Sequence, residues 1–334
     1  MTSRRQIFAN FTVSATPTAH AGLWLDKFVR HPRMTTEPGK GLGVEALKEL
    51  IRDLTHLKQP EGYRTSFTRW RNEMMDEQMR SGTVRLFELV PLGRAIVGLG
   101  EKGVTEIGVS LHHTWGVPYI PGSALKGLMA HTAHRLLDDP QWKLSDEKGE
   151  KGEMSRELFG SNDEQGLVCV LDARMVPMEG QFLYKDILTS HHQDYYTKTQ
   201  PAPPSDMDSP NPVSFLSTTC KFVVALECGD SGWTNIAEHL LAKGLETFGV
   251  GAKTSAGYGR FALKPMETAE VDRERLLRTY SLSEKLDFVV KNLEMNVFFG
   301  AFRGWLNGAD NVDSRFKNRI TEVFEQDCLE EVRA

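Results

Sequence analysis

Patterns typical of strands and helices follow one another between residues 84 and 265 in an order that few folds accommodate. The stretch VRLFELVPLG (84–93) alternates apolar and polar residues and is rich in β-forming side chains, which predicts a strand. Apolar residues at helical spacing predict two amphipathic helices further along the chain. The other expected elements are a helix at 123–137, strands at 167–176 and 217–228, a helix at 235–248 and a strand at 257–265.

The order strand, helix, strand, strand, helix, strand predicts an α+β protein with a ferredoxin-like core, the arrangement shared by RNA-recognition folds. Such a core has a four-stranded antiparallel sheet with two helices on one face. Residues 177–216 form an insertion between the second and third strands, and its second half, 200–212, is rich in proline. We therefore expect a loop or hairpin to protrude there and to contact RNA or a neighbouring subunit.

Helical spacing also marks both flanks of this core. Residues 1–80 predict a helical N-terminal extension, and residues 266–334 predict a helical C-terminal extension. The arginines near residue 70 precede the acids of their predicted helix, an order that opposes the helix dipole. Two interpretations remain open: these arginines lie on a solvent-exposed face of the helix, or they contact an anionic partner. The helices expected in the first flank are 23–30, 44–57 and 63–80.

Composition narrows the class of protein. No apolar run approaches 18 residues, so no membrane span is expected. The four cysteines form no CxxC pair, which argues against a disulfide framework or zinc knuckle and favours a cytoplasmic protein. The formal net charge of -5 argues against attraction of nucleic acid by the whole surface. This net charge is still compatible with a local basic groove, since nucleic-acid binding depends on the charges near the phosphates.

The stretch TFGVGAKTSAGYGRF (247–261) has four glycines between positions 249 and 259. Ala252 precedes Lys253, and the stretch follows a predicted helix and precedes a strand, so it is neither a Walker A loop nor a dinucleotide fingerprint. A tight turn explains Gly249 as a helix C-terminal residue but explains all four glycines less well. Residues 249–265 also carry three cations and no acid. A turn and a nucleic-acid-binding loop therefore remain two open interpretations.

A second stretch, HHTWGVPYIPGSALKGLMAH (112–131), also lacks acids. We expect Ser123 to be the N-cap of the following helix, with Lys126 in its first turn and Leu136 in its buried stripe. A helix N-terminus with a serine and a lysine suits phosphate, although ordinary capping explains the same residues.

Together these two stretches resemble the RAMP proteins of type III CRISPR systems. The segments ELFGS (157–161), LVCVLDARMVP (167–177), YKDILTSHHQDYY (184–196) and DSPNPVSFL (208–216) follow in the order seen in one RAMP family, the sixth subunits of the type III-B Cmr effector complex. The resemblance covers about residues 84–265. It implies a subunit that binds guide RNA (crRNA) without catalysis and caps the backbone filament near the guide 3′ end. It also implies contacts with target RNA, the repeated backbone subunit, the first subunit and a small helical subunit.

The expected RNA contacts follow from the two acid-free stretches, and no cofactor is expected. If Lys126, Lys253 and Arg260 each neutralise one phosphate, a plot of the logarithm of the binding constant against the logarithm of salt concentration should have a slope of about -2. The side chains in the insertion are expected to pack or to stack on unpaired bases. The expected contacts are Ser123, Lys126, Gly249, Gly251, Lys253, Thr254, Ser255, Gly257, Tyr258, Gly259 and Arg260, with His191, His192, Tyr195 and Tyr196 in the insertion.

Two alternative functions remain open. An endoribonuclease would use Asp186, His191, His192 and Asp194 for acid–base cleavage of RNA. A structural scaffold would touch no RNA at all. The adjacent histidines, including His112 and His113, are not expected to converge on a metal, because neighbouring residues on a strand point to opposite faces.

Overall fold

The computed structural model describes residues 18–27, 44–99, 107–144, 151–190, 195, 203, 205 and 211–266. All of them lie within the first of two units of the chain, residues 1–266. The predicted C-terminal extension beyond Met266 falls outside the described residues. The elements are α2 (Ala21–Asp26), α3 (Val44–His56), α4 (Glu61–Ser81), β1 (Val84–Pro91), β2 (Tyr119–Ile120), α5 (Gly122–Leu136), η2 (Pro140–Trp142), α6 (Glu153–Phe159), β3 (Cys169–Val170), β4 (Ala173–Met175), β5 (Tyr184–Ser190), β6 (Asn211–Ser217), β7 (Phe222–Glu227), α8 (Ser231–Thr247), η3 (Thr254–Ala256) and β8 (Phe261–Pro265).

The main sheet is antiparallel, with the strand order β2-β4-β7-β1-β8 and with β3 paired beside β4 on β7. Strand β1 lies between β7 and β8, where Leu89 pairs with Phe222 on one side and with Leu263 on the other. The predictions of a mixed helix-and-sheet protein and of an antiparallel sheet are confirmed. Helices α5 and α8 occupy the expected places in the chain between these strands.

Three details of the sheet differ from the expectation. The strand predicted at 167–176 is interrupted after Val170 and divides into β3 and β4. Strand β2 was not predicted, because two residues are too few to produce a periodic pattern. The last strand begins at Phe261 rather than at residue 257, since Gly257 and Gly259 both have positive φ, which strands do not use.

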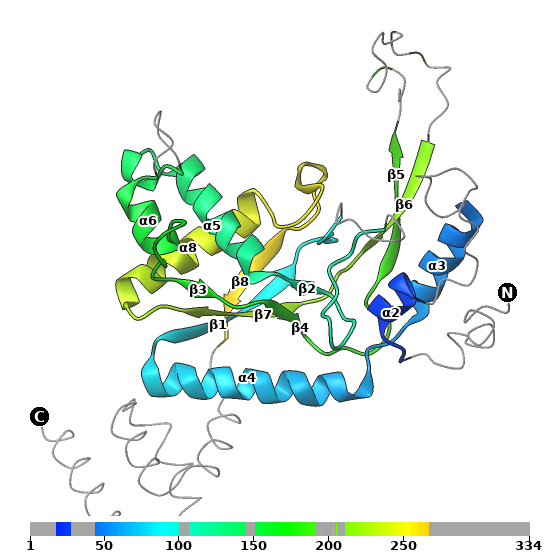
Figure 1. Ribbon diagram of the computed structural model, residues 1–334, viewed down its shortest axis with the longest axis horizontal. Helices are drawn as coiled ribbons and strands as arrows, with labels where there is room; N and C mark the ends of the chain where they lie inside the picture. The colour runs from blue at the N-terminus through cyan, green and yellow to red at the C-terminus, as the bar shows by residue number, and fades with distance from the viewer. Residues whose placement is uncertain are drawn as a thin grey trace, which may run out of the picture. The chain divides into compact units, whose positions relative to one another are not determined.

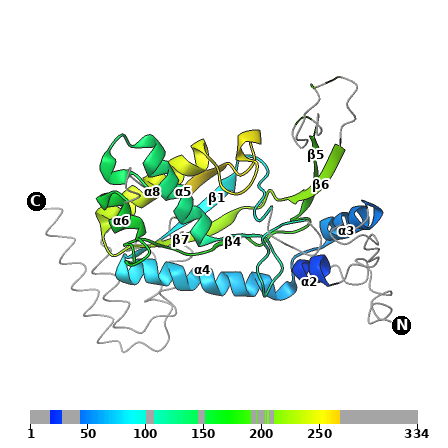
Figure 2. The same cartoon turned by 45° about the horizontal axis from the view of Figure 1, so that its top comes forward.

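Helices cover both faces of the main sheet (Figures 1 and 2). Helices α5 and α8 lie on one face and α4 lies on the other. Helix α4 is attached by polar as well as apolar contacts: the Gln78 Oε1 atom accepts the Leu86 N–H at 2.9 Å, and the Arg174 guanidinium lies 4.5 Å from the centre of the Trp70 ring. The sheet face that carries RNA in many RNA-recognition folds is therefore occupied by α4.

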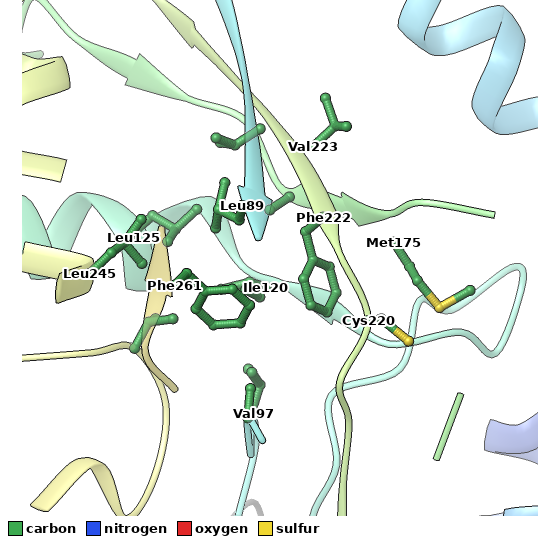
Figure 3. Packing of buried hydrophobic residues seen from close by; sticks show 14 of the residues in the cluster. Leu89, Val97, Ile120, Leu125, Met175, Cys220, Phe222, Val223, Leu245 and Phe261 are labelled. Atoms are coloured by element: carbon green, nitrogen blue, oxygen red, sulfur yellow. The ribbon is translucent and has the colours of Figure 1, made fainter. Parts of the chain in front are cut away.

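The core under α5 joins side chains from distant parts of the chain (Figure 3). Leu89 of β1, Phe222 of β7 and Phe261 of β8 meet Leu125 of α5. The prediction that Leu136 is buried with them is wrong, because this residue lies in the last turn of α5, where its side chain stays 46% exposed. No helix within the described ranges is both long and apolar enough to span a bilayer.

Gly127 provides a test of how α5 is oriented. It lies in the interior of the helix and is exposed, and an added Cβ atom would meet nothing within 4 Å. Because glycine in a helix interior is less favourable than alanine, Gly127→Ala is expected to raise the free energy of unfolding by about 1 kcal/mol. Chemical denaturation measures this change. Gly122→Ala on the same helix is the matched control and should destabilise, since its Cβ would lie 2.0 Å from the Val170 carbonyl oxygen. A loss of stability in Gly127→Ala would contradict this orientation.

Candidate nucleic-acid interface

The glycine-rich loop, defined as residues 249–259, connects α8 to β8 and has a backbone that only glycine adopts readily. All four of its glycines have positive φ, between +73° and +94°. An added Cβ atom at Gly251 would lie 2.1 Å from the Ile96 carbonyl oxygen, and one at Gly259 would lie 2.0 Å from that of Val250. The expectation that turning explains all four glycines less well than it explains Gly249 is therefore wrong. All four have the backbone conformation that glycine adopts most readily, and Gly251 and Gly259 also have no room for a side chain.

The same loop presents polar groups that could hold an anion. Lys253 has a left-handed backbone (φ 56°, ψ 34°) and is followed by the short helix η3. A left-handed residue before a right-handed one turns successive N–H groups into a common concavity, which favours anions. Within the described part of the chain, the N–H groups of Lys253, Thr254 and Ser255 and the Lys253 ammonium have no hydrogen-bond acceptor. We call these three N–H groups and the ammonium the loop nest.

The other two predicted cations are engaged inside the fold. The Arg260 Nη1 atom donates a 2.7 Å hydrogen bond to the Glu246 carbonyl oxygen at the C-terminal end of α8, where the helix dipole favours a positive charge. The Lys126 Nζ atom donates at 2.8 Å to the Val168 carbonyl oxygen, and burial lowers the pKa of this lysine. Both side chains thus stabilise the scaffold around the expected RNA site.

The start of α5 is built differently from the expectation. Pro121, not Ser123, is the N-cap residue, and no side chain of the cap accepts a hydrogen bond. Instead the Asp172 Oδ1 atom accepts the Gly122 N–H at 2.7 Å. Ser123 is exposed in the first turn. An acid from 50 residues away therefore occupies the helix terminus that the local sequence suggested for phosphate.

The residues next to the start of α5 and the end of the glycine-rich loop pack in one core cluster, although their strands, β2 and β8, lie at opposite ends of the strand order. Ile120 precedes α5, and Phe261 follows the loop; Figure 3 shows both side chains in one cluster with Leu125 and Val97. Among the described residues, no three His, Cys, Asp or Glu side chains gather as metal ligands.

The insertion contains a β-hairpin separate from the main sheet. Strands β5 and β6 pair with each other only, from Tyr184↔Ser217 to Ser190↔Asn211. The hairpin extends away from the main sheet in both views (Figures 1 and 2), as the sequence predicted. Its outer half exposes the apolar side chains of Ile187, Leu188 and Val213. Tyr195 is also exposed, whereas His191, His192 and Tyr196 lie outside the described residues.

Arg94 is a central residue that the sequence did not indicate. Its Nη1 atom lies 3.1 Å from the Asp186 Oδ2 atom, and its guanidinium lies 5.4 Å from the centre of the Tyr184 ring. The Tyr258 hydroxyl of the glycine-rich loop donates to the same Asp186 oxygen at 2.8 Å. Asp186 was a candidate for acid–base chemistry; here it joins the hairpin to the loop. Arg94 follows β1 in a segment without a motif, so only the fold reveals its role.

Comparison with known proteins identifies the family. A family model of the RAMP superfamily matches residues 86–262, more than half of the chain. The chain belongs to the RAMP superfamily. It is 33% identical to the CRISPR system Cmr subunit Cmr6 of Pyrococcus furiosus, over 50% of this chain and 64% of that relative. It is 27% identical to the CRISPR system CMR subunit Cmr6 of Saccharolobus solfataricus, over 55% of this chain and 60% of that relative. The chain thus spans less than two thirds of either relative's length.

The fold of this RAMP protein is also found in a solved complex. A chain of the type III-B Cmr-beta complex bound to cognate target RNA matches with a TM-score of 0.50 and 17% identity, over 79% of this chain and 93% of that one. At this identity the match describes the fold alone. The RAMP region 86–262 includes the glycine-rich loop, the hairpin and Arg94, whereas α2, α3 and α4 precede it.

Proposed function

We propose that this chain is a subunit of a type III-B CRISPR effector complex that binds guide RNA without cutting it and caps the backbone filament near the guide 3′ end. Similarity to the two Cmr6 proteins supports the complex, and the loop nest is the observation that carries RNA binding. The partners proposed with it are target RNA, the repeated backbone subunit, the first subunit and a small helical subunit. A cytoplasmic location goes with this role.

The ferredoxin-like class is part of the same proposal. The antiparallel order β4-β7-β1-β8, with α5 after β1 and α8 after β7, is the strand order expected for that class and supports it. In this reading β3 and β4 together form the second strand of the core, and β2 is a short addition at its edge.

The RNA is proposed to be held by its backbone. Successive N–H groups and one lysine ammonium suit a phosphate and carry no information about the base. Stacking of bases on the open sheet, the mode of many RNA-recognition folds, is unavailable because α4 covers that face. We therefore expect little sequence preference within the guide.

The surroundings of Asp186 argue against the endoribonuclease alternative. Its Oδ2 atom already accepts hydrogen bonds from Tyr258 and Arg94, and its side chain is only 22% exposed. A general base needs to reach the proton that it removes, and this carboxylate is directed at protein donors. The scaffold alternative leaves the unused donors of the loop nest without a role.

Co-expression with the neighbouring subunits tests the proposal. We expect the chain to copurify with them and with RNA whose sequencing yields guides, and the purified complex to retain less guide when Lys253 is changed. Copurification with subunits but with guide retention independent of the loop would favour the scaffold. Cleavage of RNA by the purified chain that is abolished by Asp186→Asn would favour the nuclease.

A further inference from the structure

Residues 92–97 connect the glycine-rich loop to the base of the hairpin through alternating hydrogen bonds. On one side, the Arg94 carbonyl oxygen accepts the Gly259 N–H and the Ile96 carbonyl oxygen accepts the Ala252 N–H, both at 2.8 Å. On the other side, Ala95 exchanges two hydrogen bonds with Thr218, at 2.8 and 2.9 Å. Because successive residues of an extended chain face opposite ways, one short segment holds both structures.

Side chains make a second connection between the same two structures. The Asp186 Oδ2 atom accepts from the Tyr258 hydroxyl of the loop at 2.8 Å and from Arg94 Nη1 at 3.1 Å. The Arg94 Nη1 atom also donates to the Lys185 carbonyl oxygen at 3.2 Å. The Tyr258 ring meets the Phe215 ring edge-on, with centroids 5.9 Å apart. We call Arg94, Asp186 and Tyr258 the latch.

The chemistry of the latch favours a fixed geometry. Hydrogen bonds to an ionised carboxylate are shorter and stronger than those between neutral groups. Asp186 is mostly shielded from water, so competition from solvent is limited. Burial and, after it, the hydrogen bond to Asp186 raise the pKa of Tyr258, so its hydroxyl remains a donor at neutral pH. The apolar Phe215 contact fixes the ring that carries this hydroxyl.

We propose that Arg94, Asp186 and Tyr258 are positioning residues that make the hairpin and the glycine-rich loop move as one body, so that a phosphate backbone held in the loop nest also fixes the direction of the hairpin. The identity of the ligand rests on the proposed function, whereas the mechanical coupling does not. By reciprocity, a partner that holds the hairpin would then favour binding at the loop by the same factor.

Hydrogen exchange of the purified full chain tests the coupling without RNA. Asp186→Asn and Tyr258→Phe keep the size of each side chain and remove a charge or a hydroxyl. We expect amide exchange to become about tenfold faster or more in both the loop (Ala252, Gly259) and the hairpin base (Thr218), since hydrogen bonds to a charged group are lost. Lys221→Gln, which removes an ion pair with Glu88 on the main sheet, is the matched control and should leave both regions unchanged.

Unchanged exchange of α5 and α8 amides will show that each variant still folds. Faster exchange in only one of the two regions, or in neither, would overturn the coupling. Tyr258→Phe provides an independent answer if Asp186→Asn fails to fold.

A second measurement in the assembled complex separates this inference from the proposed function. Guide RNA should slow exchange at Thr218 in the unchanged complex, and this protection should be lost in Tyr258→Phe while exchange at Lys253 stays slow. Protection of Thr218 that persists in Tyr258→Phe would overturn the positioning role. If no guide is bound by any form of the complex but the two regions still loosen together in the variants, the proposed function fails and the coupling stands.

Discussion

Gly251→Ala is expected to destabilise the glycine-rich loop by on the order of 3 kcal/mol and to abolish guide retention by the assembled complex. A left-handed backbone costs a non-glycine residue about 1–2 kcal/mol. Overlap of the new methyl group with the Ile96 carbonyl, 2.1 Å away, adds about 1–3 kcal/mol, unless the loop moves and the nest is lost. Chemical denaturation and guide retention measure the two effects. The free energy of unfolding of a whole domain is only about 5–15 kcal/mol, so this loss would be large.

Gly257→Ala is the control for this prediction. Gly257 also has positive φ, at +91°, but an added Cβ atom would meet nothing within 4 Å. We expect it to cost only about 1–2 kcal/mol, the backbone contribution alone. Equal effects of the two substitutions would contradict the close approach of Gly251 to residues 96 and 97. Full guide retention in Gly251→Ala would separate the loop from RNA binding.

Local periodicity accounts for the parts of the fold that the sequence predicted. Helix α3 was expected at 44–57 and spans Val44–His56, because its apolar residues recur at helical spacing and face the core. The order of strands and helices was predicted in the same way. The division between β3 and β4 and the short β2 were not, since they depend on pairing with strands far away in the chain.

The charged groups around the proposed RNA site were harder to predict from the sequence than the place of the glycine-rich loop in the fold. The two expected RNA-binding stretches contain no acids. In the structure, however, Asp172 accepts a hydrogen bond from Gly122, 50 residues away, and Asp186 accepts one from Tyr258, 72 residues away. The sequence also could not show that Lys126 and Arg260 donate to carbonyl oxygens. A lack of acids along the chain therefore does not establish a lack of acids in space. The place of the glycine-rich loop, by contrast, followed from its position between a helix and a strand.

Lys253 is the cation of the site whose ammonium the described structure leaves without an acceptor, so it is the residue on which RNA binding is best tested. Three phosphate contacts would give a slope of about -2 for the logarithm of guide affinity against the logarithm of salt concentration. Because Lys126 and Arg260 are engaged in the scaffold, we expect the change of slope to come from Lys253. Its replacement should weaken binding at low salt and flatten the slope by about 0.7, the value for one contact on a single strand.

The most direct measurement is guide retention by the reconstituted complex at several salt concentrations, with Lys253→Ala compared with Lys243→Ala. Lys243 is an exposed lysine on α8 that pairs with Glu246. Its replacement by alanine removes the same charge as Lys253→Ala, but at a position outside the loop nest. We expect a slope about 0.7 flatter for Lys253→Ala and an unchanged slope for Lys243→Ala. Equal slopes for Lys253→Ala and the unmodified complex would contradict RNA binding by the glycine-rich loop.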